Sequence, residues 1–105
     1  MTAEEVTKMI TEMGLPFAYH HFAEGESPDP PFVVYIYPGA DNFAADGVAY
    51  FKVNRLHIEL YTDYKDIDME EKIEAVFTKY GLFYEKSEVW ISSEKLYEVL
   101  YQMEV

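Results

Sequence analysis

A run of six apolar residues, Phe32 to Tyr37, constrains the fold of this chain more than any other feature of its sequence. All six are β-branched or aromatic, which favours an extended strand over a helix. Because the run is apolar on both faces of such a strand, we predict that the strand lies centrally in a sheet. It is also the longest unbroken apolar run, far below the roughly 20 residues that a membrane-spanning helix needs.

Two segments combine the spacing of a capping box with an apolar stripe at helical intervals, and each stripe ends at a glycine. Such segments form amphipathic helices that bury one face. We predict them over residues 3–13, with Thr2 and Glu5 as the box, and over residues 68–80, with Asp68 and Glu71 as the box.

Four further segments are predicted as strands because they are rich in aromatic and β-branched residues or alternate in polarity. The segment 48–62 is longer than most strands and its inward face changes phase, which predicts a β-bulge and a strand that projects beyond the domain. The last segment also fits a helix, but the short turn at residues 92–94 favours a closing hairpin, and we prefer the strand. The four segments are Phe17–Phe22, Val48–Thr62, Ser87–Ile91 and Leu96–Val105.

The predicted order of elements is then α-β-β-β-α-β-β. We therefore predict one α+β domain over residues 1–105, in which two helices cover an antiparallel or mixed sheet. Two segments that contain proline or glycine, 24–31 and 38–47, are predicted as exposed loops.

Acidic residues outnumber basic ones by 20 to 8, and the formal net charge is −12. Such a charge opposes association with phosphate backbones and anionic lipid, so we expect no specific nucleic-acid binding and no membrane binding. The N-terminus lacks the pattern of a signal peptide, and we expect a soluble, cytoplasmic protein. The chain has no cysteine, which excludes disulfides, thiolate metal sites and cysteine nucleophiles.

The sequence contains no constellation of residues typical of catalysis, of a metal site or of a cofactor site. Of the three histidines, His20 and His21 are adjacent on a predicted strand, so they should point to opposite faces and not share a metal. His57 and Glu59 form an H-x-E pattern, but the cysteines of a zinc deaminase are missing. We therefore expect no catalytic residues, no metal, no cofactor and no enzymatic activity.

Two features of the sequence indicate contacts with other proteins. Ten tyrosines and one tryptophan exceed what the core of such a small domain can hold, so they form either half-exposed rings on the sheet or a subunit interface. Between Lys8 and Lys52 there is no basic residue, so the two predicted loops in this stretch should carry uncompensated negative charge. The interface candidates are Tyr50, Tyr61, Tyr97 and Tyr101, and the acidic loop candidates are Glu24, Glu26, Asp29, Asp41 and Asp46.

Seven short strings, spread over nearly the whole chain, carry a family resemblance. They are Gly14–Pro16, Ala18–Phe22, Pro30–Tyr35, Asp41–Gly47, His57–Asp63, Glu70–Glu74 and Glu94–Tyr101. In this order they resemble the small tail-completion proteins that are encoded in the head–tail gene modules of long-tailed phages and their prophages. None of the strings is a chemical signature, and the resemblance lies in their order.

The resemblance implies a structural role. Members of the wider tail-terminator class form a ring, typically hexameric, at the head-proximal end of the tail tube, where they stop tube polymerisation and meet the head. The implied partners are other copies of the chain, the tail tube protein and the head connector protein. The implied location is the cytoplasm during assembly and then the tail neck of the virion. The acidic loop candidates become candidates for the channel lining or for axial contacts, because an acidic lining repels DNA phosphates.

An alternative hypothesis comes from another functional class, an acidic binding module that imitates nucleic acid and inhibits a host DNA-binding enzyme. Such a mimic should array carboxylates along one elongated surface, whereas lysines alternate with glutamates over residues 70–79 and 85–95. Binding to a basic nuclease that is lost at high salt would favour this alternative.

Overall fold

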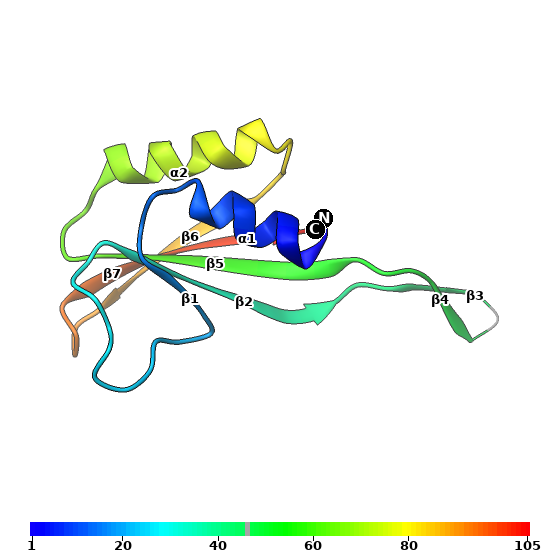
Figure 1. Cartoon of the computed structure of the whole chain (residues 1–105), viewed down its shortest axis with the longest axis horizontal. Coiled ribbons are helices and arrows are strands. Elements are labelled where there is room, and N and C mark those ends of the chain that lie inside the picture. The colour runs from blue at the N-terminus through cyan, green and yellow to red at the C-terminus, as the bar shows by residue number, and fades with distance from the viewer. Residues whose placement is uncertain (46) are drawn as a thin grey trace.

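The computed structural model describes residues 1–45 and 47–105, which form a five-stranded sheet, two helices on one face of it and a separate two-stranded hairpin (Figure 1). The strands of the large sheet are ordered β1-β2-β5-β7-β6, with β1 parallel to β2 and every other neighbouring pair antiparallel. The predicted α+β class and order of helices and strands are confirmed, with two more strands than predicted, because residues 43–45 form a strand and the segment 48–62 forms two. The elements are α1 (Ala3–Thr11), β1 (Phe17–Tyr19), β2 (Phe32–Ala40), β3 (Phe43–Ala45), β4 (Val48–Phe51), β5 (Asn54–Thr62), α2 (Ile67–Lys79), β6 (Glu85–Ile91) and β7 (Leu96–Glu104).

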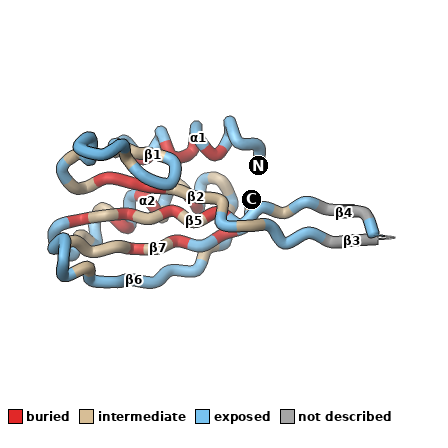
Figure 2. Tube along the Cα trace, turned by 90° about the horizontal axis from the view of Figure 1, so that it is seen from below, coloured by how far each residue is buried: buried red, intermediate tan, exposed pale blue. Residues whose placement is uncertain are grey.

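The core lies between the two helices and the face of the sheet that they cover (Figure 2). Buried residues recur at helical spacing in α1 and alternate along β5 and β7, so each element turns one face inward. The predicted capping box of α1 is confirmed: the Thr2 hydroxyl accepts from the Glu5 N–H at 3.1 Å, and the Glu5 carboxylate accepts from the Thr2 N–H at 3.0 Å. The core residues are Val6, Met9, Ile10, Met13, Val33, Leu56, Ile58, Leu60, Ile73, Phe77, Val99, Tyr101 and Met103.

The second predicted helix is confirmed as α2, but its predicted cap is wrong. The N-cap is Asp66, whose carboxylate accepts a hydrogen bond from the Met69 N–H at 3.0 Å. Because the helix begins at Ile67, one residue earlier than predicted, Asp68 and Glu71 cannot form the box. Asp68 lies in the first turn instead, where a carboxylate still favours the helix dipole.

The strand predicted over residues 48–62 is not continuous. Residues 52–53 interrupt it, so that β4 pairs with β3 while β5 runs through the middle of the large sheet. The predicted bulge lies in the neighbouring strand, because between Ile36 and Gly39 β2 has one residue more than the facing stretch of β5. As predicted, the chain projects beyond the domain, and it does so as the β3–β4 hairpin (Figure 1).

The prediction of a loop over residues 38–47 is wrong for residues 38–40 and 43–45, whereas Gly47 lies in a turn. Strand β2 continues to Ala40, and residues 43–45 form β3. The bulge accommodates Pro38, which has no N–H to donate to a regular ladder. Proline therefore marks an irregularity in this strand rather than its end.

The remaining strands differ from prediction mainly in their limits. The last segment is strand β7, as preferred, and it pairs with both β5 and β6. Strand β2, which contains the run predicted to lie centrally, is an inner strand flanked by β1 and β5. The middle strand of the sheet is β5. The first predicted strand is shorter, since β1 ends at Tyr19 and residues 20–31 form a loop on the side of the sheet away from the helices (Figure 1).

The molecule is elongated, with extents of 49 × 30 × 23 Å. We call the hairpin of residues 43–51 the arm, and the sheet face away from α1 and α2 the open face. Figure 1 shows the arm leaving the domain along its long axis, and Figure 2 looks onto the open face. The open face follows from the packing of both helices on one side of the sheet.

Candidate functional site

The arm continues two inner strands of the sheet, β2 and β5, past the point where the helices end (Figure 1). At its root the Asp41 N–H donates to the Val53 carbonyl at 2.7 Å, which ties the two connecting chains together. Within the arm Ala44 pairs with Ala49. The arm is thus a two-stranded ribbon that is anchored in the sheet through its backbone.

Arg55, which is the only arginine in the sequence, lies over the arm root. Its guanidinium occupies the space that a side chain at Gly39 would fill, so a larger residue there would displace the flexible end of Arg55. The Arg55 Nε lies 3.8 Å from the Asp41 carboxylate, and both side chains are about half exposed. An exposed ion pair at this distance contributes little stability, so Arg55 is only loosely paired within its own chain.

A cavity of about 490 Å³ opens beside the arm root, and we call it the arm-root cavity. Its apolar wall comes from the segment after α2, where Phe83 is 83% exposed. Charged side chains of both signs stand around it. Its lining includes Arg55, Leu82, Phe83, Glu85, Met103 and Glu104.

The loop of residues 20–31 begins with a sharp turn, because His20 adopts a left-handed φ of 69° directly after β1. The expectation that His20 and His21 point to opposite faces of a strand is therefore wrong, and their Nδ1 atoms lie 2.9 Å apart. Among the described residues no group of three or more metal-ligating side chains comes together. His57 lies apart from this pair, on β5 at the arm-root cavity.

The same loop covers part of the open face with aromatic rings. Phe32 packs between Phe22, at a ring-centroid distance of 5.4 Å, and Tyr61, at 5.1 Å. Burial raises the pKa of the Tyr61 hydroxyl, and the neighbouring carboxylate of Glu59 raises it further. Burial also raises the pKa of Glu59, as does the nearby Glu98, so this part of the open face is acidic.

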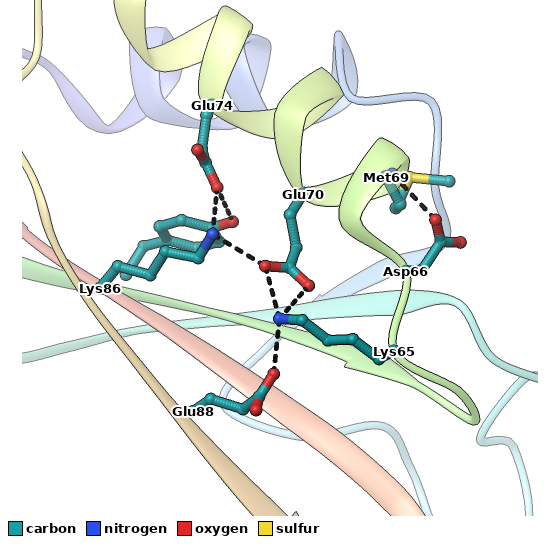
Figure 3. A network of polar contacts seen from close by, with 8 residues as sticks. Lys65, Asp66, Met69, Glu70, Glu74, Lys86 and Glu88 are labelled. Atoms are coloured by element: carbon teal, nitrogen blue, oxygen red, sulfur yellow. Dashed lines mark hydrogen bonds and ion pairs between the residues drawn. The ribbon is translucent and has the colours of Figure 1, made fainter.

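A network of lysines and glutamates joins α2 to β6 (Figure 3). Glu70 is only 2% exposed, and its two carboxylate oxygens lie 2.6 Å from the Lys65 Nζ and 2.8 Å from the Lys86 Nζ. Lys86 also contacts Glu74 at 2.7 Å, and Lys65 contacts Glu88 at 2.6 Å. Burial alone would raise the pKa of Glu70, but the hydrogen bonds from both lysines outweigh it and hold that pKa below 4.5. The network fixes α2 on the sheet and neutralises these carboxylates.

The acidic residues proposed to line a channel do not form one surface. Glu24, Glu26 and Asp29 are exposed on the loop below the sheet, whereas Asp41 lies at the arm root beside Arg55 (Figure 1). The expected uncompensated charge is therefore compensated in part at Asp41. Asp46 lies outside the described residues.

The four tyrosines proposed for a subunit interface have different environments. Tyr61 and Tyr97 are half-buried on β5 and β7, and both keep exposed surface. Tyr101 is fully buried against Phe77 of α2, so its inclusion was wrong because it offers no surface to another subunit. The side chain of Tyr50 lies outside the described part of the chain.

The exposed aromatic residue that sequence reasoning missed is Phe83. It stands between Leu82 and Tyr84, which are both half-buried, so an alternating pattern turns the middle side chain outward. Three apolar residues in succession after Gly81 were the available signal. Trp90, at 48% exposure on β6, is a second exposed ring and packs against Tyr97 at 4.7 Å.

No protein-family model matches the chain, and no curated protein matches it significantly. In the described part of the chain no helix has the length and apolarity needed to cross a membrane.

Proposed function

We propose that the protein is a structural subunit of the head–tail region of a phage or prophage, where copies of it form a ring that caps the tail tube and joins it to the head. The resemblance of its ordered sequence strings to tail-completion proteins supports this role. Its proposed partners are other copies of the chain, the tail tube protein and the head connector protein. Its proposed final location is the tail neck of the virion.

The arm is the observation that carries the proposal. Two-stranded hairpins are marginally stable in water unless something packs on them. Seven of the nine residues in 43–51 are apolar, the exceptions being Asp46 and Gly47. A ribbon of this composition, which leaves the domain along its long axis, gains free energy when another protein chain buries it. That property suits a subunit whose role is assembly.

The acidic loop gives the proposal a second support. Glu24, Glu26 and Asp29 are exposed within residues 20–31. In a ring with these loops turned toward the axis, carboxylates from every copy would repel DNA phosphates and let the genome pass without binding. This geometry needs only the loop, and not Asp41, to face the channel.

The test is to inactivate the gene in phage-producing cells and to examine the particles by electron microscopy. We expect overlong tail tubes, or tails and filled heads that fail to join, and we expect the tagged protein to retain the tail tube protein. The wild-type gene supplied in trans is the control and should restore normal particles. Normal particles in the inactivated strain would contradict the proposal.

The nucleic-acid mimic is the less favoured function because lysines interrupt the acidic surface. Glu70, Glu74 and Glu88 are each paired with a lysine along α2 and β6 (Figure 3). Normal particles together with capture of a host nuclease by the tagged protein would favour the mimic over the ring.

A further inference from the structure

We propose that a cavity on the open face binds the guanidinium group of an arginine side chain that another protein presents. The cavity has a volume of about 330 Å³, and we call it the open-face cavity. Its walls come from β2, from β5, from the loop of residues 20–31 and from the end of β6 with the turn that follows it. The inference goes beyond the proposed function, because it names the chemistry of a ligand and does not require a ring.

Aromatic rings form the apolar wall of this cavity. Phe32 is only 7% exposed and packs between Phe22 and Tyr61, which are both half-buried and keep exposed surface. Val34 and Ile91 add aliphatic lining. A planar guanidinium stacks on aromatic faces and is more weakly hydrated than an ammonium, so such a wall favours arginine over lysine.

Three carboxylates give this wall a negative potential. Glu98 faces Tyr61 in the register of β5 and β7, and Glu59 lies two residues before Tyr61 on the same face. The Tyr61 hydroxyl donates to the Glu59 carboxylate at 3.4 Å, and Glu94 lines the cavity from the turn after β6. Burial raises the pKa of the Tyr61 hydroxyl, and the charges of Glu59, Glu98 and Glu94 raise it further, so their potential acts at the cavity wall.

These three charges differ from the other partly buried carboxylates in having no cation beside them. Glu70 and Glu74 each have a lysine partner (Figure 3), whereas no ion pair in the described part of the chain includes Glu59, Glu94 or Glu98. Like charges on neighbouring strands destabilise a sheet. A cation supplied by another molecule removes this repulsion, so the arrangement favours its binding.

Two histidines contribute to the lining without cancelling the potential. The Nδ1 atoms of His20 and His21 lie 2.9 Å apart, so one ring donates to the other and the accepting ring is neutral. Among the described residues that line the cavity, none is a lysine or an arginine. The open-face cavity is therefore complementary to a cation in both its aromatic wall and its charge.

The charge of the molecule favours a different protein over a second copy as the source of the arginine. The chain has one arginine, Arg55, which already lies beside Asp41, and two copies with a net charge of −12 repel each other. The volume also limits what can enter, since it is near the lower end of the roughly 300–1,000 Å³ of small-ligand sites. The open-face cavity thus suits one long side chain of a partner rather than a whole strand or helix.

A titration of the isotope-labelled full chain, followed by nuclear magnetic resonance, tests the ligand chemistry. The probe is Nα-acetyl-arginine amide, and the control probe is Nα-acetyl-citrulline amide, which has the same length and shape but no charge. At constant low salt we expect saturable shifts at the backbone amides of Phe22, Phe32 and Tyr61 with a Kd on the order of 1 mM, and about tenfold weaker binding of the citrulline probe. Equal binding of both probes, or no saturable shift at these amides, would overturn the proposal.

Paired substitutions test whether the carboxylates act locally. Glu59→Gln combined with Glu98→Gln should weaken binding of the arginine probe about tenfold, because it removes charges that face the cavity. The matched control is Glu4→Gln combined with Glu71→Gln, which changes the net charge equally at exposed positions on the two helices. The control should change the Kd less than about twofold, since its charges lie on the other face of the sheet. Equal weakening in the two double variants would contradict the proposed site.

The aromatic wall is tested in the same titration. Tyr61→Leu and Phe22→Leu should each weaken binding of the arginine probe about threefold or more, because each removes a ring from the wall. Phe22 lies in the loop, so its variant keeps the test valid if Tyr61→Leu disturbs β5. Tyr64→Leu is the control, because Tyr64 is highly exposed and lies outside the cavity. Unchanged binding in a folded Phe22→Leu variant would count against the proposal.

A second copy of the chain is the competing occupant, and sedimentation with and without the probe distinguishes the two. If the arginine comes from a different protein, a saturating concentration of the arginine probe leaves the oligomeric state unchanged. Dissociation of oligomers by the arginine probe, but not by the citrulline probe, would assign the open-face cavity to Arg55 of a second copy and overturn the proposed occupant.

Discussion

Glu70 is buried as a carboxylate because two lysines reach it from different elements. Lys65 precedes α2 and Lys86 lies on β6, so the charge is satisfied only when helix and sheet are in place (Figure 3). A buried charge whose partners come from separate elements costs free energy whenever one of them moves. The stability that the Glu70 carboxylate contributes therefore depends on the packing of α2 against the sheet.

We predict that this carboxylate makes the fold sensitive to acid. The folded-state pKa of Glu70 is lowered, so its contribution to the free energy of unfolding is present above about pH 4.5 and is lost as the pH falls through the folded-state value. Glu70→Gln should lower the free energy of unfolding at pH 7 by about 1–3 kcal/mol and reduce its loss between pH 5 and pH 3. Urea unfolding followed by Trp90 fluorescence measures both effects. Glu71→Gln, at an exposed position on the same helix, should change neither, and an equal response of the two variants would contradict the prediction.

A second prediction concerns the hydroxyl of Tyr101, which donates to a carboxylate oxygen of Glu74 at 2.8 Å. Tyr101→Phe keeps the buried ring against Phe77 and Tyr84 and removes only this bond. We expect a loss of about 1 kcal/mol in the free energy of unfolding, from the same urea experiment. Tyr97→Phe, at a half-buried position of the same strand, should cost less. A loss of several kcal/mol would show that the ring itself had moved.

These two tyrosines also show where prediction from sequence stops at the residue scale. Tyr97 and Tyr101 lie four positions apart on one strand, so alternation correctly places them on one face. Only Tyr101 lies under α2, where Phe77 covers it. Periodicity identifies the face, but the place where a helix crosses it depends on tertiary packing.

At the scale of elements, both helices and the strand character of the C-terminal segment were predictable because their apolar patterns are long and regular. The turn at residues 92–94 correctly favoured strand β7, which pairs on both sides. The arm was not predictable as a hairpin. Pro38 indicates the end of a strand in the sequence, whereas in the structure a bulge absorbs it and β2 continues to Ala40.

The arm should be removable without loss of the domain. We predict that replacing residues 43–51 with two glycines changes the free energy of unfolding by less than about 0.5 kcal/mol, because the core of the described residues is built from α1, α2 and the large sheet. The same change should abolish self-association and, in phage-producing cells, reproduce the gene-inactivated particles. Trp90 fluorescence and light scattering measure the two effects. Unfolding of the shortened chain would show that the arm supports the domain.

At the scale of the whole molecule the charge of −12 decides how association responds to salt. Copies that meet through apolar surfaces repel each other through the rest of their charge, and salt screens that repulsion. We predict that self-association strengthens between about 50 mM and 500 mM salt, where the Debye length falls from more than 10 Å to less than 8 Å. Sedimentation at several salt concentrations measures it. Binding of a nucleic-acid mimic to a basic enzyme has the opposite dependence, so weakening with salt would point to that alternative.

The continuity of the arm with β2 and β5 has a mechanical consequence. A pull on the tip draws both strands in the same direction, so the load falls on the ladders that flank them, eight residue pairs between β5 and β7 and three between β1 and β2. These hydrogen bonds lie across the direction of pull and are strained together rather than one after another. A force applied to the arm is therefore distributed through the backbone of the sheet. Under rising force β1 would detach before β7, because its ladder is shorter.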